Sequence, residues 1–373
     1  MNSLSDFTEL TSKQHKWPRL LLLGALLSLA SCKDENLTPE QRWLATATGQ
    51  IQQSYQQLAQ DTQAQQQQAA QFCKAPDAAG LQQAQTAWRQ AMGSWQHIQW
   101  LKLGPIAKDN DDWKLQFWPD KKNILQRKTQ DILNGSDPIT ADSLSHASVM
   151  VQGFSAQELL LFDTEFAAPE KFAGRQCELL QATTVLTTAT TKRLADSWKE
   201  EAFLKTWANP KTVPQGHTPA QVRNGELLDA LLGQVERVKN DKLGEPLGMK
   251  NRDKKPNGYF AESWRSDNSL NNIHQNLLGL QELLRPQEGY GLFQYLKDLG
   301  HQPVADELVI KLDNAQQALQ QIQPPLSRSV TDAAQQPALQ KAHQTLGELA
   351  TFIKQKLAPA LGVSLGFNSN DGD

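Results

Sequence analysis

The sequence predicts an all-α protein. Long stretches are dominated by Gln, Ala and Leu, which favour helices, whereas the alternating β-branched runs that are typical of strands are scarce. Apolar side chains recur at three- and four-residue spacing, as at Trp88, Met92 and Trp95. A stripe of this kind is more often the buried face of a helix than a cofactor site.

The N-terminal residues 1–31 predict an export signal. Basic residues precede an apolar run at 20–29, which is about ten residues long and too short to span a bilayer. The run ends in Leu-Ala-Ser-Cys, which resembles the lipobox of bacterial lipoproteins and makes Cys32 the acylated first residue of the mature chain. The alternative is a plain secretory signal that is cut nearby and leaves Cys32 as an unmodified thiol.

This N-terminus also predicts the location of the protein. Lys33, rather than aspartate, follows the cysteine, and by the usual sorting pattern of such lipoproteins this favours the outer membrane. We therefore expect a lipid-anchored protein of the cell envelope that faces the periplasm. The net charge of −3 gives no sign of nucleic-acid binding.

The helices of the mature chain are predicted from their start signals and periodicity. Thr38-Pro39-Glu40-Gln41 is a capped helix start, and the same Thr-Pro-x-Gln pattern recurs at Thr218. The Pro- and Gly-rich segment 209–217 predicts a junction between an N-terminal bundle, 32–208, and a C-terminal bundle, 218–373. Helices are expected at about 39–73, 78–103, 121–133, 152–162, 175–200, 219–239, 273–284, 290–299, 305–322 and 331–357, with a long irregular segment at 104–119.

Two cysteines remain beside Cys32. An oxidising compartment permits a disulfide between Cys73 and Cys177, which would close a long loop, but the sequence does not show that they meet. Neither has a second cysteine or a histidine at metal-ligand spacing.

The motif that stands out is Gly153-Phe154-Ser155-Ala156-Gln157-Glu158, at the start of a predicted helix. Ser155 and Glu158 are three residues apart, so their hydroxyl and carboxyl groups share one helix face. The simpler interpretation is an ordinary polar stripe. Helix-borne zinc-peptidase, nucleophile-elbow and phosphate-loop motifs are all missing from the sequence.

Several motifs together resemble the imelysin-like family of bacterial envelope proteins. They are the lipobox, Ala87-Trp88-Arg89, the loop Leu115 to Asp120 with Trp118 and Asp120, the Gly153 to Glu158 motif, Glu262-Ser263-Trp264-Arg265-Ser266 and the tail Leu365 to Asp373. The resemblance implies two packed helical-bundle halves with a site between them, a link to iron uptake, and a debated classification as metallopeptidases.

The family signature is Gly-x-His-x-x-Glu, and this sequence departs from it. Gly153 and Glu158 match, but Ser155 stands in place of the histidine. A hydroxyl is a poor zinc or iron ligand, so a metal here would rely on Glu158 and distant carboxylates, a set better suited to ferric iron, calcium or magnesium than to zinc. The resemblance also places Glu262, Ser263 and Ser266 at the site, although Ser266 or Asn268 could simply cap the next helix.

Two functions follow as hypotheses. The first is a binding lipoprotein that captures iron, haem or an iron-uptake protein in a cleft between the halves, and the missing histidine favours it. The alternative is a metal-dependent peptidase of the imelysin type that uses Glu158 as ligand or general base.

Overall fold

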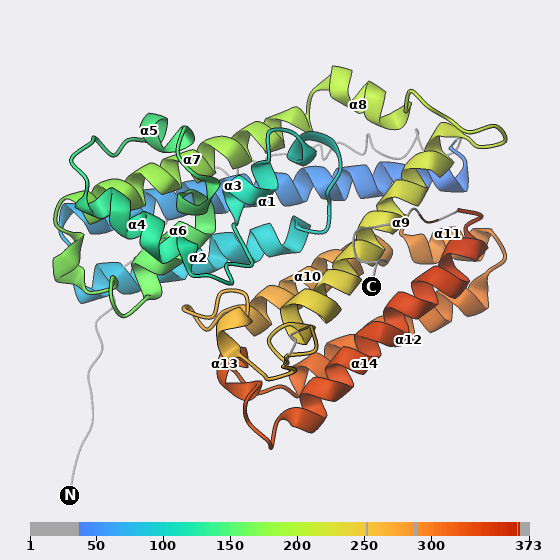
Figure 1. Ribbon diagram of the computed structural model, residues 1–373. Helices are drawn as coiled ribbons and strands as arrows, with labels where there is room; N and C mark the ends of the chain where they lie inside the picture. The colour runs from blue at the N-terminus through green and yellow to red at the C-terminus, as the bar shows by residue number, and fades with distance from the viewer. Residues whose placement is uncertain (1–36, 251–252, 287–288, 364, 366–373) are drawn as a thin grey trace, which may run out of the picture. The chain divides into compact units, whose positions relative to one another are not determined.

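The structure, a computed structural model, confirms the all-α class. It describes residues 37–250, 253–286, 289–363 and 365, and every regular element in these ranges is helical (Figure 1). The chain from Thr38 onward forms one compact unit. The predicted signal peptide, Cys32 and the tail 366–373 lie outside the described residues. Within them, no helix has the length and hydropathy needed to cross a membrane.

The helices are joined by connections of very different length, and the one between α9 and α10 spans residues 238–268. Their bounds are α1 Pro39–Lys74, α2 Ala78–Ile98, α3 Asp111–Leu115, α4 Ile124–Asn134, α5 Ala141–Ser145, α6 Gly153–Phe162, α7 Arg175–Ser197, α8 Glu201–Ala208, α9 Pro219–Arg237, α10 Ser269–Leu284, α11 Leu292–Asp298, α12 Gln302–Gln320, α13 Leu326–Ser329, α14 Gln336–Phe352 and α15 Ala358–Ala360.

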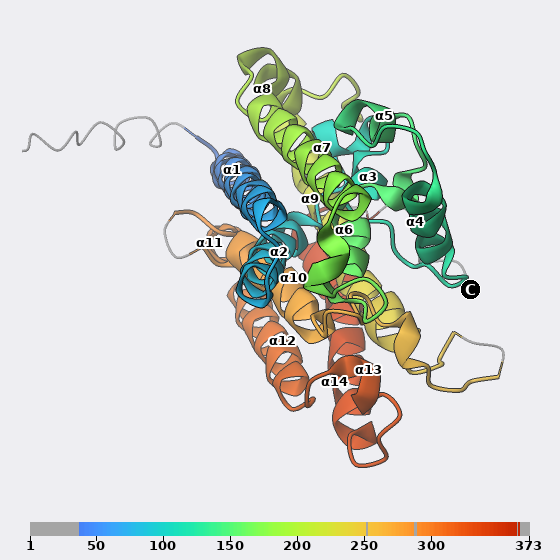
Figure 2. The same ribbon diagram turned by 90° about the vertical axis from the view of Figure 1, so that its left-hand side faces the viewer.

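The first group of helices is built on α1, which packs along α2 and α7 (Figure 2). The predicted capping box is present: the Thr38 hydroxyl accepts from the Gln41 amide, and the Gln41 side chain accepts from the Thr38 amide. A disulfide between Cys73 and Cys177, 104 residues apart, joins the end of α1 to the start of α7. α6 packs against α2 and α7, so the motif helix is held by two of the three long helices of the group.

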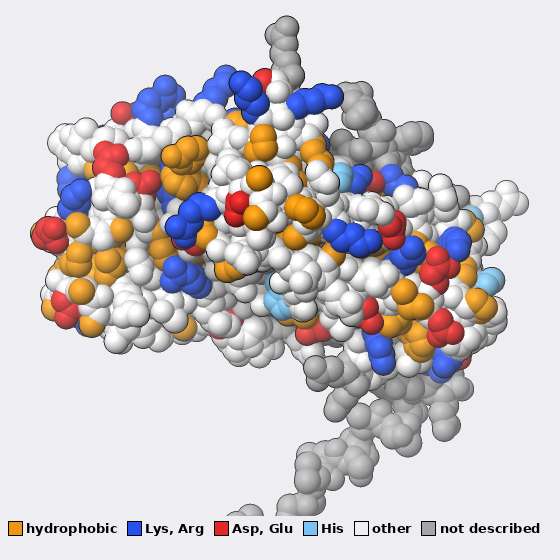
Figure 3. Space-filling model, turned by 90° about the horizontal axis from the view of Figure 1, so that it is seen from below, with side chains coloured by type: hydrophobic (Ala, Val, Ile, Leu, Met, Phe, Trp, Pro, Cys, Tyr) orange, Lys and Arg blue, Asp and Glu red, His pale blue; other side chains and the backbone are white. Residues whose placement is uncertain are grey.

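The second group contains α9, α10, α12 and α14. α12 packs along α14, while α10 packs along α2 and thereby joins the two groups (Figures 1 and 2). α9 starts with the same capping box as α1, at Thr218 and Gln221. The predicted junction 209–217 is the loop between α8 and α9. On the face seen in Figure 3, charged side chains of both signs are interspersed.

Several predicted boundaries were wrong. α2 ends at Ile98 rather than near Leu103, and the residues 98–101 at this end are all buried. The irregular segment 104–119 contains a 3-10 turn and α3, and the short α8 was not predicted. After α9 the chain continues as a π-helical stretch, Val238–Gly244, rather than ending as an α-helix near residue 239.

Candidate functional site

The motif helix α6 starts where two backbones touch. Gly153 has a φ of +66°, and a Cβ atom there would lie 2.2 Å from the Lys114 carbonyl oxygen and 2.3 Å from that of Leu115. No other residue fits this position without moving the end of α3. Gly153 therefore fixes α6 against the chain that leads to Trp118.

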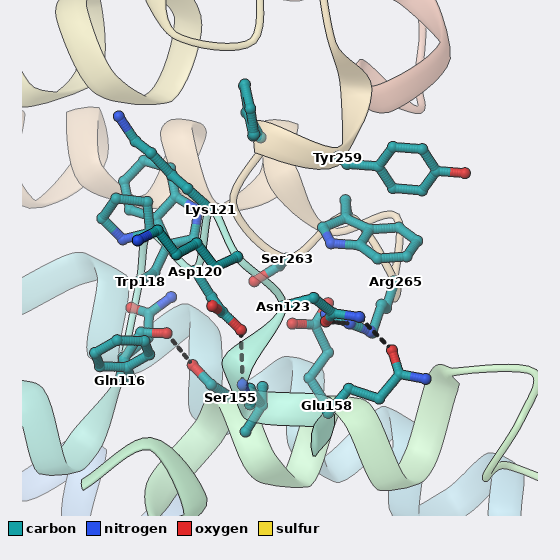
Figure 4. Close-up of a pocket in the computed structure, with 17 residues that line it drawn as sticks. Gln116, Trp118, Asp120, Lys121, Asn123, Ser155, Glu158, Tyr259, Ser263 and Arg265 are labelled. Carbon is teal, nitrogen blue, oxygen red and sulfur yellow. Dashed lines mark hydrogen bonds between the residues drawn. The ribbon is translucent and has the colours of Figure 1, made fainter. Parts of the chain in front are cut away.

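Ser155 and Glu158 point from α6 toward the same region (Figure 4). The Ser155 hydroxyl donates to the Phe117 carbonyl oxygen at 2.8 Å. The Glu158 Oε1 atom accepts two hydrogen bonds from Ser266, one from the backbone amide at 3.0 Å and one from the hydroxyl at 2.8 Å. Glu158 thus joins α6 to the segment that precedes α10.

The environment of Glu158 favours the protonated acid. Burial raises the pKa of the Glu158 carboxyl to about 7, although the two bonds from Ser266 and the charge of Arg265 act in the opposite direction. A carboxyl that is half protonated near neutral pH is a weaker cation ligand than an ordinary glutamate.

A cavity of about 490 Å³ opens beside this pair. We call it the motif cavity. Of the residues predicted at the site, Trp118, Asp120, Ser155, Glu158 and Ser263 line it (Figure 4). The wall also carries four further aromatic side chains and three cations that come from both helix groups: Phe117, Tyr259, Phe260, Trp264, Lys121, Lys122 and Arg265.

Most of the charged groups on this wall already have partners. Asp120 accepts from the amides of Ile124 and Leu125, both at 2.9 Å, and so caps α4. Arg265 pairs with Asp163, with a nitrogen–oxygen distance of 2.8 Å. Lys121 pairs with Glu245 at 2.7 Å.

Lys122 is different, because it is exposed at the cavity and makes no ion pair with any residue that the structure describes. It is the one lining cation of this wall for which the described part of the chain holds no acidic partner.

Glu262 does not line the motif cavity, contrary to the expectation. Its carboxylate is fully buried against Lys242, with an Nζ–Oε2 distance of 2.8 Å. Burial alone would raise the pKa of Glu262, but the charge of Lys242 and its hydrogen bond hold it below the usual value. Five amide side chains complete this buried network: Gln96, Gln99, Gln116, Asn272 and Asn276.

Neither Ser266 nor Asn268 caps α10 through its side chain, which was the alternative to a role at the site. Asn268 occupies the N-cap position, but its side-chain Nδ2 group donates to the Asn272 Oδ1 atom and does not cap the helix. Ser266 is used by Glu158. Both side chains are buried and bond other buried side chains, so neither is free to accept from the backbone amides at the start of α10.

Comparison with known proteins fits this arrangement. Residues 51–353 match the model of the imelysin family. The chain belongs to the imelysin family. A related protein, iron-regulated protein A of Synechococcus elongatus, is 22% identical over 297 residues, which are 77% of each chain.

Solved imelysin structures share the fold. An imelysin-like protein from Psychrobacter arcticum 273-4 superposes with a TM-score of 0.74 at 20% identity, covering 89% of this chain and 99% of that one. A protein from Parabacteroides distasonis, provisionally assigned as an iron-regulated protein A precursor, gives a TM-score of 0.66 at 18% identity, covering 88% and 96%.

The imelysin signature raises the question of whether a metal fits here. Within the described ranges, no three His, Cys, Asp or Glu side chains lie close enough together to hold one. Ser155 bonds a carbonyl group, Glu158 accepts from Ser266, and Glu262 is paired with Lys242. In this arrangement the side chains around Glu158 do not match the donor set of a metal site.

Proposed function

We propose that this imelysin-family chain is an envelope lipoprotein, anchored through Cys32 in the outer membrane and facing the periplasm, which binds an iron-containing ligand. The ligand is haem or an anionic ferric complex, and the binding serves iron uptake. The lipobox-like sequence and the name of the relative from Synechococcus elongatus support the location and the link to iron.

The observation that carries the binding role is the state of the motif cavity. Its carboxyl groups are engaged by protein donors, whereas aromatic faces and the unpaired Lys122 remain open to a ligand. Tyr259 illustrates this, because it is 69% exposed and meets the neighbouring Trp264 edge-on, with 4.8 Å between the ring centres. The Trp264 ring itself is covered by the Arg265 guanidinium, which lies 4.4 Å from its centre. Aromatic faces and cations suit a flat anionic ligand.

The test uses the full chain in detergent. We expect isothermal titration calorimetry to show binding of haemin or ferric citrate, and Lys122→Gln to weaken it. Lys297→Gln, which removes a lysine outside the motif cavity, serves as the control. Failure of both ligands to bind would contradict the proposal. So would cleavage of casein that chelators stop and that Glu158→Gln abolishes, because that result supports the peptidase alternative.

The envelope location is tested separately. We expect metabolic labelling with palmitate to modify the wild-type chain but not Cys32→Ala, and the variant to leave the membrane fraction. A chain that is unlabelled and soluble in the wild type contradicts the anchor but not the binding role.

A further inference from the structure

A second cavity, also of about 490 Å³, lies between α9 and the chain that follows α2. Three tryptophans line it, namely Trp100, Trp113 and Trp118. Trp100 is buried, while Trp113 is 43% exposed. We call this space the tryptophan cavity. Trp118 and Pro119 line the motif cavity as well, so the two cavities share this part of their walls.

One cation of the tryptophan cavity makes no ion pair within the described part of the chain, although its charge helps to lower the pKa of the buried Glu262. Arg237, the last residue of α9, lies over the Trp118 ring with its guanidinium carbon 6.0 Å from the ring centre. It makes no hydrogen bond or ion pair with the described residues. Lys102, the other cation on this wall, is held by Asp112 at 3.3 Å.

The acidic side chains of the same wall are already used. Glu226 pairs with Arg223, Asp241 pairs with Lys250 at 2.8 Å, and Asp229 has a partner of its own. The half-buried Arg237 guanidinium is thus the cation that no described acidic side chain of this wall pairs with. A cation withdrawn from water in this way gains free energy when an anion reaches it.

A second donor stands beside Arg237. Gln234 lies three residues earlier on α9, so the two side chains share a helix face, and both line the cavity. The Gln234 side chain is buried, and its Nε2 group has no hydrogen-bond partner in the described part of the chain. An acceptor placed between the two side chains would satisfy both.

We propose that the tryptophan cavity is a second binding site, for a planar aromatic carboxylate. The ring lies against the indole faces, and the carboxylate accepts from the Arg237 guanidinium and the Gln234 amide. The volume lies within the range of about 300–1,000 Å³ that is usual for small-molecule sites. This site goes beyond the proposed iron function and does not depend on it.

A cation is the other ligand that a tryptophan-lined cavity could attract. Arg237 argues against it, because the guanidinium already lies over Trp118 and would repel a second positive charge. The charge of the ligand therefore distinguishes the two possibilities.

The experiment titrates the full chain with 2-naphthoate, its uncharged amide 2-naphthamide, and phenyltrimethylammonium, using isothermal titration calorimetry. We expect the wild type to bind naphthoate at least tenfold more tightly than either of the others. Arg237→Gln is expected to weaken naphthoate at least tenfold and naphthamide less than threefold. Lys297→Gln, at a lysine outside both cavities, is the control and should change naphthoate affinity less than threefold. Lys122→Gln shows whether naphthoate binds in the motif cavity instead.

A second variant keeps the test decisive if Arg237→Gln does not fold. Trp113→Ala removes an exposed ring and is expected to weaken naphthoate and naphthamide alike, by at least threefold, with an unchanged far-ultraviolet circular dichroism spectrum. The proposal is overturned if the wild type binds none of the three, prefers the amide or the cation, or loses naphthoate as strongly in Lys122→Gln as in Arg237→Gln. Unchanged naphthoate affinity in Arg237→Gln or Trp113→Ala would overturn it too.

Discussion

The amide and the hydroxyl of Ser266 both donate to the same oxygen of Glu158, across 108 residues of sequence. Two such bonds would ordinarily lower the pKa of a carboxyl group. The Glu158 carboxyl nevertheless has a pKa raised to about 7, because it is removed from water. Desolvation is therefore the larger effect at the centre of the motif.

This balance predicts a pH-dependent stability. The ordinary pKa of 4.5 applies to the unfolded chain. Below that pH Glu158 is protonated in both the folded and the unfolded chain, so its burial costs no ionisation energy and the fold keeps its full stability. Between about 4.5 and about 7 the folded chain binds more protons than the unfolded one, and stability falls as the pH rises. Glu158→Gln removes this loss of stability, because a glutamine side chain does not ionise.

The measurement is the melting temperature of Glu158→Gln minus that of the wild type. We expect the difference to become more positive from pH 4.5 to pH 7.5. Glu201→Gln, at a side chain that is 83% exposed, is the control and should give a constant difference. A constant difference for Glu158→Gln as well would show that its pKa is not raised.

A second prediction concerns the buried Lys242–Glu262 pair. Lys242→Met leaves the Glu262 charge without its cation in the interior, and we expect it to lower the free energy of unfolding by about 3–5 kcal/mol. The double variant Lys242→Met with Glu262→Gln should recover at least about half of that loss, because no charge stays buried. Urea denaturation gives both values. A double variant that is less stable than Lys242→Met would argue against this explanation.

A third prediction restores the family signature. Ser155→His places an imidazole where the family signature has one, three residues from Glu158, and we expect zinc to bind at least tenfold more tightly than to the wild type in equilibrium dialysis. Ser155→Ala is the control. It should fold, bind no additional zinc, and lose about 1–2 kcal/mol because the Phe117 carbonyl group loses its donor. Equally tight zinc binding by the wild type would show that the site has lost no ligand.

The fourth prediction concerns the start of α6. Gly153→Ala combines a positive φ with a clash against the backbone of α3, so we expect a loss of at least about 2 kcal/mol in the free energy of unfolding. Gly174→Ala is a matched control, since Gly174 has a φ of +79° but an open surrounding. It should lose about 1–2 kcal/mol, less than Gly153→Ala, because only the backbone strain remains. Similar losses in both variants would mean that the contact with α3 contributes little.

The helices could be predicted from the sequence because caps and periodicity are local signals. The identical boxes at Thr38 and Thr218 were found in this way, and the structure contains both. The start of α6 was also predicted within one residue. The short α8 was missed, because its eight residues bury little beyond Trp207.

The candidate site could be predicted only in part. The family motifs led to Ser155, Glu158 and Ser263, which the structure brings to one cavity. Lys242 gave no signal, since Asn240-Asp241-Lys242 looks like a solvated helix face until the π-helical stretch turns the lysine inward. The pairing of a charge with a partner 20 residues away depends on tertiary packing, which no local pattern contains.

The Cys73–Cys177 disulfide closes a ring that includes some of the residues lining the motif cavity and leaves out others. The ring that it closes contains Ser155 and Glu158 but not Ser263 to Ser266. A single proteolytic nick inside 74–176 therefore leaves two fragments that migrate together until a reductant is added. A nick in the loop after Gly244 separates the chain into pieces at once under denaturing conditions. After a cut within 74–176, the fragments that carry the Ser155 and Glu158 side of the cavity therefore stay joined by the disulfide. The side that carries Ser263 is held by the peptide chain alone.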